Sequence, residues 1–234
     1  AQRMADLAAS VVRAPDAVVA QLEALPGVDA VETRVSGIAL VDLPGVAEPV
    51  SARVLSLPAG REARVNAIVL LAGRVPAPGR DNEVVINEAF AERNALGPGD
   101  TLAAVLYGRR RVLEVVGVAS SPEFVFAVAP GEITPEPQRF GVFWLGREGL
   151  ARAYDLDGAF NDVVIRRARD AAPRELMAAV DRLLARHGGR GSYGRDRMIS
   201  AQFLEDELRS LQTMASVLPP VFMAVAVFLV NVSL

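Results

Sequence analysis

The 234-residue chain lacks two residue types on which many enzymes and metal sites depend. It has no cysteine, and all 25 of its basic residues are arginine. Without lysine the chain cannot form a Walker A phosphate loop of the usual kind or a lysine Schiff base, and without cysteine it has no thiol nucleophile and no cysteine zinc site. Its single histidine, His187, excludes an HExxH metal site. These absences remove most common catalytic designs, so we expect a protein that is not an enzyme and has no cofactor.

The overall composition is that of a folded protein. Hydrophobic residues make up 51% of the chain and charged residues 23%, which argues against intrinsic disorder. The length suits one large or two small domains. The formal net charge of -3 argues against a nucleic-acid partner, because such a partner requires a basic surface.

The C-terminal end has the composition of a membrane segment. No charged residue occurs from Ser210 to Leu234, and residues 217–234 are apolar apart from two prolines, an asparagine and a serine. Eighteen helical residues rise about 27 Å, close to the thickness of a bilayer core. We therefore expect residues 217–234 to begin a transmembrane helix, the alternative being a buried core helix. The preceding segment, 195–209, has no excess of arginine, which favours the extracytoplasmic side for the rest of the chain.

Helical spacing of apolar residues predicts a stalk at each end of the globular part. Residues 1–15 are expected to form an N-terminal stalk helix, and residues 196–216 a C-terminal stalk helix. The chain has no initiator methionine and stops within the apolar run, so both ends look like cuts. We expect a parent protein in the cell membrane, with one span before residue 1, another starting near residue 217, and this domain displayed between them.

Between these ends, helix and strand signals alternate, which predicts an α+β fold. A helix starts near Pro15 and ends at Pro26-Gly27, and a second helix starts at Pro173 and ends at Gly188. Asn87 is expected to cap a helix over residues 88–96, and Gly108 to lie in the turn of a hairpin. The expected strands are residues 28–41, 50–57, 83–86, 101–107, 111–118, 141–145 and 161–167.

One apolar run is the candidate contact surface for a partner or cargo. It lies in the proline-rich segment 120–140 and consists of Phe124, Val125, Phe126 and Val128, with Ala127 between them. The alternative is an ordinary buried strand between two turns, because apolar runs of this length are common in sheets.

Other chemically interesting residues have ordinary structural interpretations. Glu83 and Glu88 would have to converge in a pocket to act as an acid and base pair, and nothing in their spacing requires it. His187 is placed to cap the last turn of a helix. The cluster Arg109 to Arg111 is typical of a solvated turn.

Several short motifs occur in an order and spacing that resemble a known family. They are Leu25-Pro-Gly-Val28, Leu70-Leu-Ala-Gly-Arg74, Glu83-Val-Val-Ile-Asn-Glu88, Leu96-Gly-Pro-Gly-Asp-Thr101 and Val115-Val-Gly-Val118. With the membrane-like end, nearly the whole chain resembles the extracytoplasmic domain of MacB/FtsX-type ABC transporter permeases.

The resemblance implies a two-part architecture. A Porter-like part of two βαβ units would comprise residues 16–57 and 141–195, with a β-rich, Sabre-like insertion at residues 58–140. The partners implied are a separate ABC ATPase subunit or domain, a second permease copy, membrane lipid, and a lipid, lipoprotein, peptide or drug cargo. The implied function is to couple ATP hydrolysis to export, extraction or mechanotransmission. A membrane-anchored binding or sensor module without an ATPase is the alternative.

Overall fold

The computed structural model describes residues 4–195, except 44–45, 47, 126 and 130–133. The predicted C-terminal stalk and the start of the transmembrane helix, residues 196–234, lie outside the described residues. In the part that is described, no helix has both the length and the apolar character needed to span a bilayer.

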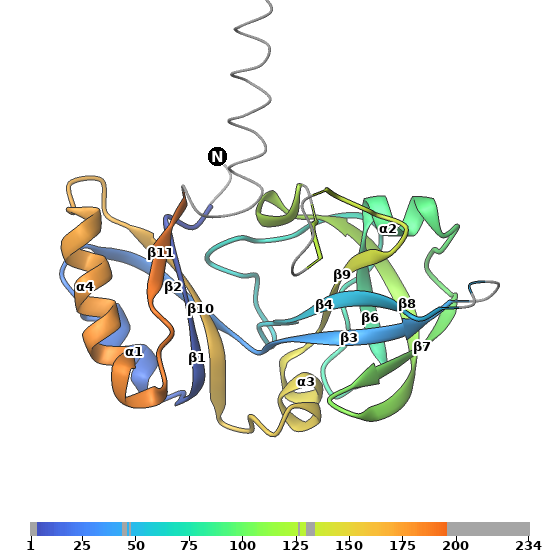
Figure 1. The fold of residues 1–234 in the computed structure, drawn as a ribbon, viewed down its shortest axis with the longest axis horizontal. Coiled ribbons are helices and arrows are strands. Elements are labelled where there is room, and N and C mark those ends of the chain that lie inside the picture. The colour runs from blue at the N-terminus through green and yellow to red at the C-terminus, as the bar shows by residue number, and fades with distance from the viewer. Residues whose placement is uncertain (1–3, 44–45, 47, 126, 130–133, 196–234) are drawn as a thin grey trace, which may run out of the picture.

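The first of two sheets has four antiparallel strands with two helices on one face (Figure 1). The chain forms two βαβ units, β1-α1-β2 and β10-α4-β11, and the strands lie in the order β11-β1-β10-β2. The elements are β1 (Leu7–Pro15), α1 (Val18–Glu23), β2 (Val28–Arg34), β10 (Ala159–Arg167), α4 (Pro173–Leu184) and β11 (Ser192–Gly194), with a short 3-10 turn η2 (Ala185–His187) after α4.

The helices cover this sheet because their apolar residues recur on one side. Leu176, Val180 and Leu184 of α4 are buried at a spacing of four residues, and they pack with Leu22 of α1. These side chains meet the strand residues that face the helices, such as Ile165. The opposite face of the sheet turns toward the second sheet.

The second sheet closes into a barrel. Its strand order is β5-β8-β6-β9-β4-β3-β7, and a further pairing of β7 with β8 closes the strands from β8 to β7 into a ring, with β5 outside it. β4–β9 and β6–β8 are the parallel pairs. The elements are β3 (Ser36–Asp42), β4 (Val50–Leu57), β5 (Val69–Gly73), β6 (Glu83–Asn87), α2 (Glu88–Arg93), β7 (Thr101–Leu106), β8 (Arg109–Ser120), η1 (Pro122–Phe124), β9 (Phe140–Gly146) and α3 (Arg147–Ala153).

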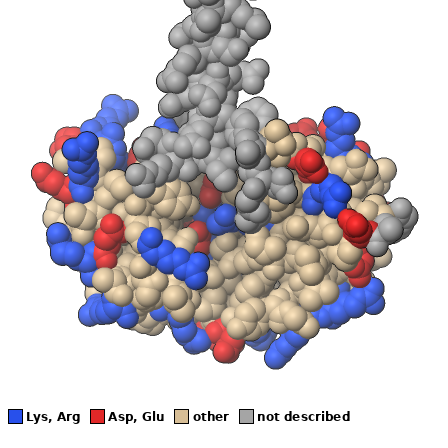
Figure 2. Space-filling view, in the orientation of Figure 1, with Lys and Arg blue, Asp and Glu red and all other residues tan. Residues whose placement is uncertain are grey.

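The long strand β8 explains why β5 lies outside the closed ring. Residues 109–114 of β8 pair with β7, whereas residues 117–120 pair with β5. The barrel interior is filled by apolar side chains, with Phe90 of α2 packed edge-on against Phe143 of β9. In Figure 2, charges of both signs are interspersed around one face, and uncharged surface extends over β3.

The expected N-terminal stalk helix is wrong over the residues that the structure describes. Residues 7–15 form β1, which pairs with β10 and β11. Leu7, Ala8 and Ala9 are all buried because both faces of the strand are covered. A strand covered on both faces has a continuous apolar run, which a helical spacing also fits.

The expected boundaries between the two parts also differ from the structure. β3, β4 and β9 belong to the seven-stranded sheet, although the sequence placed them with the two βαβ units. The first sheet therefore comprises residues 7–34 and 159–194, and the barrel lies between them in the chain. Periodicity identified these strands, but it carries no information on which strand pairs with which.

Several local predictions are confirmed. β7 and β8 form a hairpin whose turn residues, Tyr107 and Gly108, both have positive φ, as a two-residue hairpin turn requires.

The expected cap by the Asn87 side chain is wrong. Asn87 does precede α2, but its side chain makes no cap. Instead its Oδ1 accepts a hydrogen bond from the backbone N–H of Val142, at 2.7 Å.

Candidate functional site

A cluster of polar side chains, all buried except the partly buried Glu123, joins the two sheets. It consists of Arg34 on β2, Asp162 on β10, Glu123 on η1 and Asn66 in the segment before β5, and we call it the polar joint. Arg34 and Asp162 point away from the helices, because their neighbours Val31 and Val163 pack into the helix-side core. Glu123 and Asn66 reach them from the barrel side of the molecule.

Arg34 is the centre of the polar joint. Its Nε donates to Asp162 Oδ2 at 2.7 Å, and its two terminal nitrogens donate to the two carboxylate oxygens of Glu123, at 2.5 and 2.9 Å. Asn66 Nδ2 donates to Glu123 Oε2 at 2.7 Å. The backbone N–H of Ala5 donates to Asn66 Oδ1 at 2.8 Å, so the joint is also bonded to the first described residues.

Burial and the neighbouring charges shift the pKa values of Arg34 and Glu123 in opposite directions. Burial disfavours the charged guanidinium, but Asp162 and Glu123 more than offset it and raise the pKa of Arg34 above its usual value. Burial likewise disfavours the Glu123 carboxylate, yet Arg34 and Arg53 hold the pKa of Glu123 below its usual value. Arg34 and Glu123 are therefore charged together, and the charge of each offsets the cost of burying the other.

Further polar contacts hold the two sheets beside the joint. Glu32 of β2 is buried, and its carboxylate accepts hydrogen bonds from both terminal nitrogens of Arg61, at 2.7 and 2.8 Å. Arg147 of α3 donates to the carbonyl oxygen of Thr33 at 2.8 Å and to Asp16 at 2.6 Å. The barrel is thus fixed to the four-stranded sheet at several separate points.

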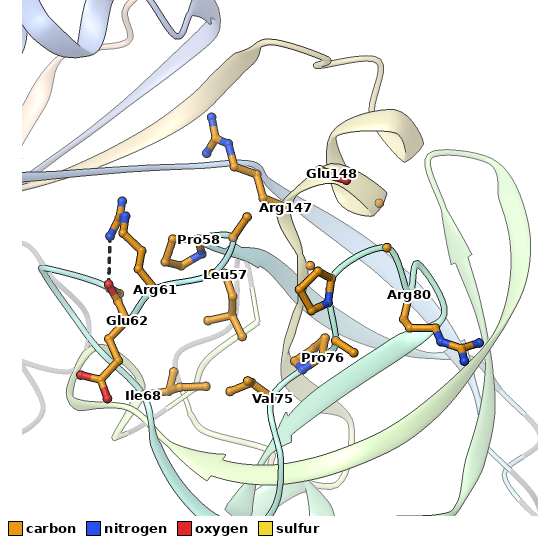
Figure 3. Close-up of a pocket in the computed structure, with 18 of the residues that line it drawn as sticks. Leu57, Pro58, Arg61, Glu62, Ile68, Val75, Pro76, Arg80, Arg147 and Glu148 are labelled. Atoms are coloured by element: carbon orange, nitrogen blue, oxygen red, sulfur yellow. Dashed lines mark hydrogen bonds between the residues drawn. The ribbon is translucent and has the colours of Figure 1, made fainter.

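An apolar cavity of about 600 Å³ lies at one side of the barrel (Figure 3). Three segments line it: residues 57–70 after β4, residues 75–81 before β6, and residues 146–149 at the start of α3. Leu57, Pro58, Ile68, Val75 and Pro76 surround the space, whereas Arg61, Arg80 and Arg147 lie at its margin. Its size and lining are typical of a site for a small apolar group.

The predicted contact surface is mostly packed against the protein. Phe124 is half-buried and lies edge-on to Trp144, with ring centroids 6.4 Å apart. Val128 is buried, Val125 is 57% exposed, and Phe126 lies outside the described residues. Among the described residues of this run, only Val125 offers a free apolar side chain, and no strand forms here. Contact with a partner at this run stays a prediction.

The remaining candidates have structural roles. Glu83 is held by Arg74 at 2.6 Å and by the backbone N–H of Ala77 at 2.8 Å. Glu88 begins α2 at the other end of β6, about 16 Å away along the strand, so the two carboxylates do not converge. His187 lies in η2, directly before Gly188, which ends that segment in the left-handed conformation.

The polar joint and the cavity were not predicted from the sequence. The available signal was a strand with charged residues at alternate positions, Glu32 and Arg34, whose other neighbours are apolar. Such charges inside a strand indicate a polar face that another part of the protein covers. No signal in the sequence identified Asp162 or Glu123 as the partners.

The first and last described residues lie side by side. Leu7 of β1 pairs with Gly194 of β11, and the backbone N–H of Arg195 donates to the carbonyl oxygen of Asp6 at 3.1 Å. Any segment before residue 4 and any segment after residue 195 therefore start from neighbouring points on the molecule.

Two solved structures have the same fold. One is the extracellular domain of the ABC-type transporter YknZ from Gram-positive bacteria, with 12% sequence identity and a TM-score of 0.50; the match covers 80% of this chain and 98% of that one. The other is the periplasmic region of MacB from Actinobacillus actinomycetemcomitans, with 9% identity and a TM-score of 0.51, over 89% of this chain and 94% of that one. No family model matches the sequence, and no curated protein matches it.

The chain therefore has the mixed α and β fold of the extracytoplasmic domains of ABC-type transporter permeases. This confirms the mixed α and β fold that the sequence resemblance implied, whereas the Sabre-like character of the insertion stays a prediction. The likeness extends over nearly the whole of the YknZ and MacB domains, so both sheets belong to the shared fold.

Proposed function

We propose that this chain is the extracytoplasmic domain of an ABC transporter permease. It would couple ATP hydrolysis in the cytoplasm to export, extraction or mechanotransmission outside the membrane. The observation that carries the proposal is the shared fold, which covers 98% of the extracellular domain of YknZ. ATP would be hydrolysed by a separate ABC ATPase subunit or domain, and the chain itself would act without catalysis.

The adjacent ends of the described region support this function. A domain inserted between two membrane helices must begin and end at neighbouring points, as β1 and β11 do here. The localisation proposed is the cell membrane, with this domain on the extracytoplasmic side, and the segment 217–234 would begin one of the helices.

The polar joint supports transmission of motion. The backbone of Ala5 is hydrogen-bonded to Asn66, and Asn66 to Glu123, which holds Arg34 of the four-stranded sheet. A displacement applied at the first described residues therefore reaches both sheets through short hydrogen bonds, of which those to Glu123 involve a charged group. Packed elements held in this way move as one rigid body.

The test is to purify the full-length parent protein from its own membranes and to assay the preparation for a co-purifying ATPase. Because this chain has no cysteine, Val112→Cys introduces a single site for a spin label within it, on an exposed position of β8. In a permease dimer, the distance between the two labels is then compared without nucleotide, with ATP, and after trapping with vanadate.

A co-purifying ATPase and a label distance that changes with nucleotide support the proposal. An ATPase without any change in distance contradicts mechanotransmission and leaves the permease assignment in place. If no ATPase associates with the parent protein, the permease assignment is wrong. The apolar cavity then favours a membrane-anchored binding module.

A further inference from the structure

β5 is an edge strand with little of the usual protection: its one irregularity is a shift of register against β8 between Leu70 and Ala72. Among the described residues it pairs only with β8, and all five of its residues are exposed. Val69 and Leu71 are each 51% exposed, and the strand contains no charged residue and no proline. Edge strands normally carry a charge, a proline or a covering segment, because their free N–H and C=O groups pair with other chains.

The cavity is continuous with this strand. Leu70 of β5 lines the cavity, and so does Val75, two residues beyond the end of the strand. Val69, which precedes Leu70 in regular pairing, therefore lies on the opposite face, whereas Leu71 is the extra residue at the register shift. A chain that paired with the free edge of β5 would place alternate side chains at the cavity.

The charges around the cavity balance. Three arginines and three carboxylates line it: Arg61, Arg80, Arg147, Glu62, Asp81 and Glu148. Three of these six form ion pairs with residues outside the lining. Arg61 pairs with Glu32, Arg147 with Asp16, and Asp81 with Arg152. The site thus has no net charge and an apolar floor, which suits an uncharged apolar group.

We propose that β5 and the cavity bind an extended, uncharged and apolar polypeptide segment. The segment adds a strand to the free edge of β5 and inserts one apolar side chain into the cavity. A polypeptide is favoured over a lipid acyl chain because the free backbone groups of β5 need N–H and C=O partners, which an acyl chain lacks. The inference does not rest on the proposed ATPase partner.

The test measures binding of a defined probe to the full chain in detergent micelles. The probe is a short fluorescein-labelled peptide of alternating valine and threonine, and binding is followed by fluorescence anisotropy. A second peptide has the same sequence with alternate backbone nitrogens methylated, which removes the donors that a new strand needs. A fluorescent fatty acid tests the acyl-chain alternative.

Two variants and one control separate strand addition from non-specific adhesion. Val69→Lys places a charge on the face of β5 opposite the cavity, and Ala67→Phe fills the cavity itself. Val112→Lys places the same charge at a position of β8 that is 63% exposed and distant from β5 along the strand. We expect each of the first two variants to weaken peptide binding about tenfold or more, and the control to leave it unchanged.

The outcomes decide the proposal. Binding of the unmodified peptide that is lost on methylation, together with slower hydrogen exchange of residues 69–75, supports it. Equal binding of the methylated peptide overturns it, as does equal weakening by Val112→Lys. Binding of the fatty acid alone, or of neither probe, also overturns it.

Discussion

Removal of the Arg34 side chain is the sharpest test of the polar joint. Arg34→Met keeps much of the length of the side chain but leaves Asp162 and Glu123 without their common cation. Removing one partner of a buried ion pair costs about 3–5 kcal/mol, because an uncompensated charge stays in the interior. Asp162 keeps Arg53 at 3.8 Å and Glu123 keeps Asn66, so we expect the lower end, about 3 kcal/mol.

The assay is thermal unfolding of the full chain in detergent at pH 7. For a domain of this size a loss of 3 kcal/mol lowers Tm by about 6–12 °C. The control is Arg64→Met, which removes an exposed ion pair with Glu23 and should cost at most about 1 kcal/mol. Adding Asp162→Asn and Glu123→Gln to Arg34→Met should restore part of the loss. Equal effects of Arg34→Met and Arg64→Met would refute the reasoning.

Two further predictions concern β5 and the strand that follows it. Gly117→Ala places a Cβ 2.5 Å from the carbonyl oxygen of Arg74, so we expect a loss of about 1–3 kcal/mol and faster hydrogen exchange in β5; Gly97→Ala, where a Cβ meets nothing within 4 Å, should be nearly neutral. The Arg74 guanidinium and the Ala77 N–H lower the pKa of Glu83 from its ordinary 4.5 to about 2, despite opposing desolvation, so its contribution is full above about pH 4.5 and is lost as the pH falls toward 2. Unfolding measured from pH 6 to 2 should therefore show a shallower decline for Glu83→Gln than for the unchanged chain, and parallel curves would contradict this.

Local structure was predictable wherever neighbouring residues determine it. The helix at Pro173 was identified by a proline in its first turn and an apolar face, and the β7–β8 hairpin by the glycine at its turn. The strand at residues 83–87 was identified from its apolar run between turns. Each of these signals lies within a few residues of the element that it predicts.

Strand pairing and side-chain contacts between segments far apart in the sequence were not predictable in the same way. β1 pairs with β10 and β11, whose sequences give no indication of that pairing, and its apolar residues fitted a helix equally well. The boundaries between the two sheets failed for the same reason. The polar joint combines residues from β2, η1 and β10, so only the fold identifies it.

The motifs that carried the resemblance have a physical explanation in the structure. Gly73 and Gly117, from two separate motifs, are paired directly where β5 runs antiparallel to β8. A Cβ on Gly73 would lie 2.2 Å from the carbonyl oxygen of Val116, so the backbones approach too closely for any side chain. These two glycines therefore mark a close approach of two paired backbones, which gives two of the motifs a structural reason.

In the sequence, the strands of the barrel lie between the two halves of the four-stranded sheet, and this order affects how the molecule folds. All the barrel strands lie between residues 36 and 146, whereas Leu7 of β1 has its partner, Ile165, near the other end of the chain. Closing that long loop costs less chain entropy once the intervening residues are already compact. We therefore expect the barrel to form first, and β1 to wait until β10 has left the ribosome or the translocation channel. Until then β1 is an apolar strand without its partners.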